Sequence, residues 1–329
     1  MPKLFFEDFE PGDVATYGAY PVTKEAIIAF AKEFDPQPFH LDEELAKHSL
    51  LKGLAASGWH TAAMLMRMNC DHFVADMASL GSPGVIELNW LKPVRPGDIL
   101  SGRSTIRERR VSQSRPETGL VRFFFEVLNQ SGEIVMNQDC FIMVGRRGME
   151  PPPPRIVKPI KFEPFTEVQW PMTPLWFEDM PDKGGTTLGT YTFDTENMIR
   201  FATSFDPQPF HLSEEAAKKS PFGQLAASGW HTAAAWMRTH LANHRKIVAE
   251  RKAAGIDVAP TAPSPGFKDL KWLKPVFAGD VVTYSSRITG KRVTSHPGWG
   301  LVAQQSAGVN QHGEQVFEFQ GVVFWPTKP

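Results

Sequence analysis

The sequence is poor in cysteine and has no long uninterrupted apolar run. Its 329 residues include only Cys70 and Cys140, too few for a disulfide framework. No stretch approaches the ~20 apolar residues of a membrane span. The 35 basic residues are balanced by 36 acidic ones, so the net positive charge typical of nucleic-acid-binding proteins is absent. Disulfide-rich, membrane-spanning and nucleic-acid-binding classes are therefore disfavoured.

Several motifs of cofactor and nucleophile chemistry are also missing. There is no P-loop, no GxGxxG fingerprint, no nucleophile elbow and no Cys/His cluster with zinc spacing. Residues 1–13 have no basic region followed by an apolar run, so they do not resemble a signal peptide. We therefore expect a cytoplasmic globular protein without metal or cofactor, and the length predicts about two domains.

The most informative feature is an internal repeat. Residues 34–63 and 205–234 are identical at 23 of 30 positions, at a constant offset of 171. The offset rises to 182 where Trp90 matches Trp272, so the second copy contains 11 additional residues between the two blocks. A period this long indicates a duplicated domain rather than a solenoid.

The joint between the copies is rich in proline. Residues 145–174 contain the run Pro151–Pro154 and four further prolines. Because proline lacks an amide donor and favours extended backbone, this stretch predicts a semi-rigid strap rather than a packed element. We expect one domain over 1–145, a linker over 146–174 and a second domain over 175–329.

Each copy has the pattern of an α+β domain. In the first copy a helix is predicted over 23–34, a short one over 42–48 and a longer one over 60–78. Four β-rich runs follow, at 84–91, 98–108, 120–128 and 133–144, the last two joined by a hairpin turn. This order predicts a helix wrapped by an antiparallel sheet. We expect the 11 additional residues, within or after the second copy's helix, to form a solvated surface extension. The alternative is that they reshape one pocket.

An aspartate and a histidine five residues apart are the first candidates for chemistry. Asp35 and His40 recur as Asp206 and His211, each pair in a segment that two prolines stiffen. Such a pair can hold a water molecule between two groups that exchange protons, as general acid–base catalysis requires. The alternative is that Asp35 caps the following turn and His40 packs as an ordinary neutral histidine.

The second candidate is a glycine immediately before the long helix. Gly58 and Gly229 would leave backbone amides unpaired at the positive end of the helix dipole, where they can donate hydrogen bonds to the oxygen of a polarised thioester carbonyl. The alternative is that glycine merely permits close packing at this point. His60 and His231 are interpreted as packed or hydrogen-bonded residues, since no partner lies at metal-ligand spacing.

The segment from Phe34 to His40, followed by a short helix and the sequence Ala56-Ser57-Gly58, resembles the hydratase motif of the MaoC-like, (R)-specific enoyl-CoA hydratase family. That resemblance implies two hotdog domains, each a long helix wrapped by an antiparallel sheet, fused into a pseudo-dimer. Gln37 and Gln208 stand where the family commonly has asparagine. The resemblance covers nearly all of both copies.

The resemblance also implies a reaction. Water would add across the 2,3 double bond of a trans-2-enoyl thioester, carried by CoA or acyl carrier protein, giving the (R)-3-hydroxyacyl product, or the reverse dehydration would occur. Because both copies keep the motif, the chain could contain two working sites. The sequence also allows a further homo-oligomer. The implied site residues are the catalytic Asp35, His40, Asp206 and His211, the thioester-binding Gly58 and Gly229, and the supporting Gln37, Gln208, Ser57, Ser228, His60 and His231.

Two rival functions remain at this point. A hotdog thioesterase would hydrolyse the acyl thioester instead, but residues 60–68 offer no acidic side chain of the kind such enzymes use. A non-catalytic acyl-thioester binding module would tolerate loss of Asp35 and Asp206, and both are present.

Overall fold

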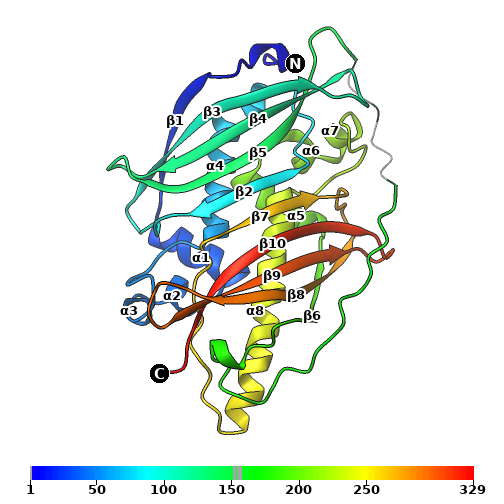
Figure 1. The fold of residues 1–329 in the computed structure, drawn as a ribbon. Coiled ribbons are helices and arrows are strands. Elements are labelled where there is room, and N and C mark those ends of the chain that lie inside the picture. The colour runs from blue at the N-terminus through cyan, green and yellow to red at the C-terminus, as the bar shows by residue number, and fades with distance from the viewer. Residues whose placement is uncertain (1, 151–152, 154–157) are drawn as a thin grey trace.

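The computed structural model describes residues 2–150, 153 and 158–329. Of the proline run at 151–154, only Pro153 lies within the described residues. The two copies of the repeat form two similar halves that lie side by side (Figure 1).

Ten strands form a single antiparallel sheet that runs through both halves. Their order is β1-β3-β4-β5-β2-β7-β10-β9-β8-β6, so the sheet of each half continues into the other where β2 pairs with β7. Figure 1 shows this seam across the middle of the molecule. The strands are β1 (Val14–Pro21), β2 (Gly84–Trp90), β3 (Ile99–Val111), β4 (Thr118–Leu128), β5 (Ile134–Gly145), β6 (Gly184–Thr192), β7 (Gly266–Trp272), β8 (Val281–Val293), β9 (Trp299–Val309) and β10 (Gln315–Pro326).

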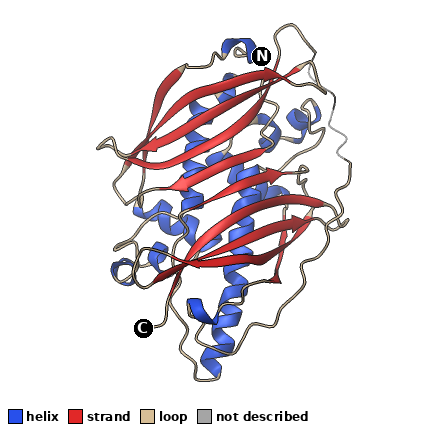
Figure 2. Ribbon diagram, viewed as in Figure 1, coloured by secondary structure: helices blue, strands red, loops and turns tan. Residues whose placement is uncertain are grey.

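One long helix in each half lies against the concave side of the sheet (Figure 2). These helices are α4 and α8, and their apolar residues join the residues facing inward from the strands in one continuous core. This arrangement, an antiparallel sheet wrapped around a central helix and present twice, is the double hotdog fold that the sequence predicted. The helices are α1 (Lys24–Phe34), α2 (Pro38–Leu41), α3 (Glu43–Lys47), α4 (Gly58–His72), α5 (Thr195–Phe205), α6 (Pro209–Leu212), α7 (Glu214–Lys218) and α8 (Gly229–Ala253), with short 3₁₀ turns at Phe6–Asp8, Val74–Asp76 and Phe177–Asp179.

The local predictions are largely correct in kind and differ at the boundaries. Thr23 caps α1 by accepting a hydrogen bond from the Ala26 amide, as a helix N-cap should. The long helix begins at Gly58 and ends at His72, six residues before the predicted end. Strand β1 and its counterpart β6 were not predicted.

The additional residues of the second copy follow the predicted solvated extension at most positions, and Arg251 is the exception. They extend α8 to Ala253, but this extension is not simply a solvated surface. The Arg251 side chain is buried, and its guanidinium donates hydrogen bonds to the backbone oxygens of Pro171, Thr173 and Ile247. The end of α8 is thereby fastened to the linker.

The linker has no helix or named strand among its described residues, and residues 158–174 are exposed or half-buried. Its described part passes along one side of the second half (Figure 1). Trp170 lines a cavity there, and Leu175, just beyond the linker, is buried at the same place. Within the described residues, no helix has both the length and the apolar character needed to cross a membrane.

Candidate active site

The Asp35–His40 segment breaks the helical path twice. Helix α1 ends at Phe34, because Pro36 and Pro38 remove amide donors and disfavour helical geometry before them. Pro38 then occupies the first position of α2, where its missing amide costs nothing. His40 therefore lies on this short helix rather than in a loop, and the change of direction brings it back toward Asp35.

Three side chains surround the buried carboxylate of Asp35. Gln37 Nε2 donates to Oδ1 at 2.9 Å, and Ser57 Oγ donates to Oδ2 at 2.6 Å. His40 Nε2 lies 3.5 Å from Oδ2. Asp35 thus does not cap the following turn, and both members of the predicted pair lie in one cluster together with Gln37 and Ser57.

The backbone fixes the tautomer of His40. Its Nδ1 lies 2.7 Å from the carbonyl oxygen of Ala55. Because a carbonyl oxygen only accepts, Nδ1 must carry the proton, and in the neutral ring Nε2 is then an acceptor. The imidazole lone pair and the Asp35 carboxylate therefore face the same small space.

The amide of Gly58 is the first of helix α4, where no intrahelical acceptor exists for it. The glycine is sterically required: a Cβ atom there would lie 2.3 Å from the indole of Trp90, whose Nε1 donates to the Gly58 carbonyl oxygen at 3.0 Å. The amide lies at the positive end of the helix dipole and can bind a carbonyl oxygen that gains negative charge.

The second copy repeats this geometry closely. Asp206 accepts from Gln208 at 2.9 Å and from Ser228 at 2.7 Å, and its Oδ2 lies 3.4 Å from His211 Nε2. His211 Nδ1 is 2.7 Å from the Ala226 carbonyl oxygen. Gly229 packs against Trp272 as Gly58 packs against Trp90. At the level of the motif the two sites are equivalent.

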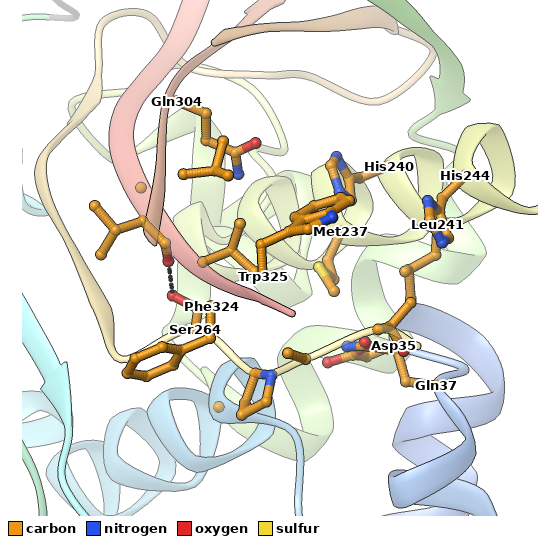
Figure 3. A pocket seen from close by; sticks show the side chains of 18 of the residues that line it. Asp35, Gln37, Met237, His240, Leu241, His244, Ser264, Gln304, Phe324 and Trp325 are labelled. Carbon is orange, nitrogen blue, oxygen red and sulfur yellow. Dashed lines mark hydrogen bonds between the residues drawn. The ribbon is translucent and has the colours of Figure 1, made fainter. Parts of the chain in front are cut away.

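The surroundings of the two pairs are different. A cavity of about 360 Å³ is lined by Asp35, Gln37, His40, Gly58 and neighbouring residues of the first half at one end, and by many side chains of the second half. In Figure 3, Asp35 and Gln37 lie beneath Leu241 on one side and Gln304 lies on the opposite side. The wall residues that the second half contributes include Leu188, Trp236, Met237, His240, Leu241, His244, Ser286, Ile288, Gln304 and Trp325.

Three phenylalanines explain why the first half lacks this space. Phe73, Phe123 and Phe125 pack together below the sheet, with ring centroids 5.3–6.4 Å apart. The aligned positions of the second half hold His244, Gln304 and Ser306. The strand register supports this alignment: Phe125 faces Ser104 as Ser306 faces Ser286. Smaller and more polar residues thus leave open a volume that aromatic rings fill in the first half.

The second aspartate–histidine pair is covered by the first half. Cys70 Sγ contacts Asp206 Oδ1 at 3.6 Å, and Ser79 Oγ donates to Gln208 Oε1 at 2.7 Å. At the equivalent place near Asp35, Leu241 replaces Cys70 and lines the cavity. The Gln37 Oε1 atom has no hydrogen bond to any described residue. The catalytic-type groups of the second copy thus meet protein atoms where those of the first meet open space.

The two helix histidines are packed inside the core. The His60 ring stacks on Phe30 with centroids 4.5 Å apart, and the His231 ring stacks on Phe201 at 4.7 Å. Burial lowers the pKa of each to about 3, so both imidazoles are neutral at pH 7. Neither lines the cavity. Across the described part of the chain, no cluster of three His, Cys, Asp or Glu residues is arranged to hold a metal ion.

The cavity wall is the part of the site that the sequence analysis missed. The residues in question come from α8, from the strands of the second half and from the linker, and they lie outside the repeated motif that forms the other part of the lining. One signal was available. Positions where the two copies differ, such as Phe123 against Gln304, mark the places where one half is filled and the other is open.

Comparison with known proteins agrees with this architecture. A computed family model described as "MaoC like domain" matches residues 9–122 and 177–310. The uncharacterized protein YdeM of Bacillus subtilis is 28% identical over 141 residues, 43% of this chain and 98% of its own length. The mesaconyl-CoA hydratase of Cereibacter sphaeroides is 37% identical over 54 residues, only 16% of each chain.

The structural comparison extends over the whole chain. A crystal structure of a putative MaoC domain protein dehydratase from Chloroflexus aurantiacus superposes with a TM-score of 0.75 and 17% identity, covering 100% of this chain and 99% of the other. The family match spans most of both halves. The chain therefore belongs to the MaoC-like dehydratase family and contains two MaoC-like domains.

Proposed function

We propose that the chain is a hydro-lyase that adds water to the 2,3 double bond of a trans-2-enoyl thioester, giving an (R)-3-hydroxyacyl thioester, or catalyses the reverse dehydration. The observation that carries this proposal is the position of Asp35 and His40 side by side at one end of a cavity large enough for an acyl group. The (R) configuration follows from the family resemblance.

The pair is suited to holding the reacting water. Both the Asp35 carboxylate and His40 Nε2 accept hydrogen bonds, so a water molecule between them donates both of its protons. Its oxygen lone pair is then directed away from the pair and toward the cavity. Hydrogen bonds from Gln37 and Ser57 hold the carboxylate in place for this task.

The reaction then needs only groups that are present. The water oxygen bonds to C3 while the pair takes one of its protons, and the double-bond electrons move through C2 to the thioester oxygen. The Gly58 amide, at the start of α4, stabilises the negative charge on that oxygen. The pair returns a proton to C2, the thioester carbonyl re-forms, and the elements of water have been added without change of oxidation state.

We propose further that only the first pair works. The cavity extends from Asp35, whereas Asp206 and Gln208 are in contact with Cys70 and Ser79. The catalytic groups of the first half and the acyl cavity of the second half would thus form one composite site. The carrier of the acyl group is CoA or acyl carrier protein.

The experiment is hydration of a series of trans-2-enoyl-CoA thioesters, followed by the loss of the conjugated enoyl absorbance. We expect turnover to the (R)-3-hydroxyacyl product, and a decrease of about 10²- to 10⁴-fold in kcat for Asp35→Asn. The matched Asp206→Asn variant removes the same group from the covered copy and should retain most of the activity. Equal losses in both variants would contradict the single-site proposal.

The same assay tests the alternatives. Release of free CoA from saturated acyl-CoA would indicate a thioesterase. Absence of turnover with every thioester, together with acyl-CoA binding that Asp35→Asn leaves unchanged, would indicate a non-catalytic binding module.

A further inference from the structure

The wall of the cavity contains polar atoms that no protein group satisfies. His240 Nδ1 and Trp236 Nε1 are buried and have no hydrogen-bond partner among the described residues. The Gln304 side-chain amide faces the cavity and likewise makes no hydrogen bond to a described residue. A buried polar atom without a partner costs about 1–3 kcal/mol, so such atoms are uncommon unless a ligand or water completes them.

In the first half, the residue at the position equivalent to His240 has a hydrogen-bond partner. Asn69 occupies the place on α4 that His240 occupies on α8, and its Oδ1 accepts a hydrogen bond from Tyr17 at 2.6 Å. Leu188 stands at the position of Tyr17 in the second half and provides no such donor. The unpaired state of His240 is therefore specific to the half that contains the cavity.

A pair of hydroxyl groups adds to the polar lining. Ser286 and Ser306 are 2.7 Å apart, and one hydrogen bond between them leaves one hydroxyl proton free. Ser286 and Gln304 both line the cavity. These groups lie on the sheet, facing α8. In Figure 3, His240 and Trp325 are seen between Gln304 and Asp35, so the polar groups are separated from the catalytic end.

The two histidines at this polar end of the cavity carry no charge that would bind an ionised group. Burial lowers the pKa of His240 to about 4 and also lowers the pKa of His244, so both rings are neutral at pH 7. Among the described residues, two cations belong to the wall. Lys92 pairs with Glu133, and the exposed side chain of Arg287 donates to the neutral Gln305 amide and lies over the ring of Phe165.

We propose that the acyl group accepted by this protein carries a neutral oxygen, as a hydroxyl or keto group, remote from the thioester, and that His240 and Gln304 recognise it. This inference rests on the proposed function, because it assumes that the cavity beside Asp35 holds the acyl group. A volume of about 360 Å³ falls in the range of about 300–1,000 Å³ that is typical of small-molecule pockets, which suits a medium-length or ring-bearing acyl group.

The kinetic test compares thioesters of equal length. The substrates are trans-2-octenoyl-CoA, its 7-oxo and 8-hydroxy derivatives, and the corresponding α,ω-dicarboxylic thioester. We expect kcat/KM to be at least tenfold higher for the oxo or hydroxy substrate than for the unsubstituted one, and the dicarboxylic substrate to be poor. Equal or better use of the unsubstituted or the dicarboxylic substrate would overturn the proposal.

Variants link the preference to the named residues. His240→Leu and Gln304→Leu should each reduce the ratio of oxygenated to unsubstituted kcat/KM toward one. Gln320→Leu, on β10, changes the same kind of amide outside the cavity wall and should leave that ratio as it is. Thermal unfolding of each variant checks that it folds. A ratio that neither cavity variant changes would contradict the assignment.

A binding measurement separates this proposal from the proposed reaction. Titration calorimetry of the Asp35→Asn protein with octanoyl-CoA and with 7-oxo-octanoyl-CoA requires no turnover. Tighter binding of the oxo ligand that His240→Leu abolishes would support the recognition even if no thioester were hydrated. Equal binding of the two ligands would overturn it whatever the reaction.

Discussion

At the scale of single residues, the two glycines that begin α4 and α8 offer a matched pair. Each lies against a tryptophan indole, and an added Cβ would come within 2.3 Å of Trp90 at Gly58 or 2.4 Å of Trp272 at Gly229. The steric strain of an alanine is therefore similar at both positions. Only Gly58 also lines the cavity.

We predict that Gly58→Ala and Gly229→Ala destabilise the protein alike, by about 1–3 kcal/mol, because each displaces an indole in a packed region. Only Gly58→Ala should also lower kcat, by about 10- to 100-fold, because it moves the amide that binds the thioester oxygen. Urea unfolding and enoyl-CoA hydration measure the two effects. Similar kcat values for the two variants would show that the Gly58 amide has no part in the reaction.

The buried histidines of the two long helices predict a pH dependence of stability. The pKa of His60 and of His231 is about 3 in the folded protein and about 6.5 in the unfolded chain, so below pH 6.5 the unfolded chain binds more protons. Stability is therefore full above this pH and falls as the pH is lowered.

Between pH 6.5 and pH 5 each of these histidines should reduce the free energy of unfolding by about 2 kcal/mol. Urea unfolding at pH 7 and pH 5 measures the loss, and His60→Leu should make it smaller by about that amount. The exposed His296 offers a control, since its replacement by glutamine should leave the pH dependence unchanged. A steeper loss in His60→Leu than in the parent protein would contradict this account.

The residues of the motif were predictable, and those of the cavity were not. Asp35, His40 and Gly58 lie within one short segment whose repetition drew attention to it. Gln304 lies more than 240 residues from that segment and reaches the same site only because the two halves pack together. Gln304 faces open space only because the second half lacks the phenylalanines that fill the equivalent region of the first half. A motif in a single sequence does not contain that information.

At the scale of elements, the additional residues of the second copy lengthen α8, and the lengthened helix contacts the linker. The helical pattern of its charged residues indicated a solvated extension, and most of the side chains between Arg245 and Lys252 are indeed exposed or half-buried. Arg251 is the exception, since it turns back to the linker. The same extension carries His244 and Ile247 into the cavity wall.

We predict that Arg251→Met lowers the free energy of unfolding by about 2 kcal/mol, because it leaves partly buried backbone oxygens of the linker without donors. Lys252→Met changes the adjacent exposed residue and should be nearly neutral. Chemical unfolding measures both. An equally small effect of the two substitutions would mean that the linker is held in place by its other contacts.

At the scale of the whole molecule, the seam between β2 and β7 joins the two halves. Gly84 and Gly266 lie at this seam, and a Cβ at Gly84 would be 2.0 Å from the carbonyl oxygen of Leu270. The backbones approach so closely that no other residue fits without separating the strands. The proposed composite site depends on the same contact, because Asp35 and much of the cavity wall belong to opposite halves.

We predict that Gly84→Ala reduces stability by about 3 kcal/mol or more and reduces hydratase activity with it. Gly290→Ala is the control, since a Cβ there meets no atom within 4 Å. Thermal unfolding and the enoyl-CoA assay measure both variants. Full activity in Gly84→Ala would show that the seam can adjust without disturbing the site.

The covalent joining of the halves has a consequence for how the cavity is maintained. In a symmetric dimer of identical domains, every substitution appears at both sites, so an open pocket on one side requires one on the other. Unfilled volume in a core weakens the fold. In this chain the three phenylalanines of the first half keep one site filled, while their counterparts leave the other open. The stability that unfilled core volume costs is thus lost at one cavity per molecule rather than at two.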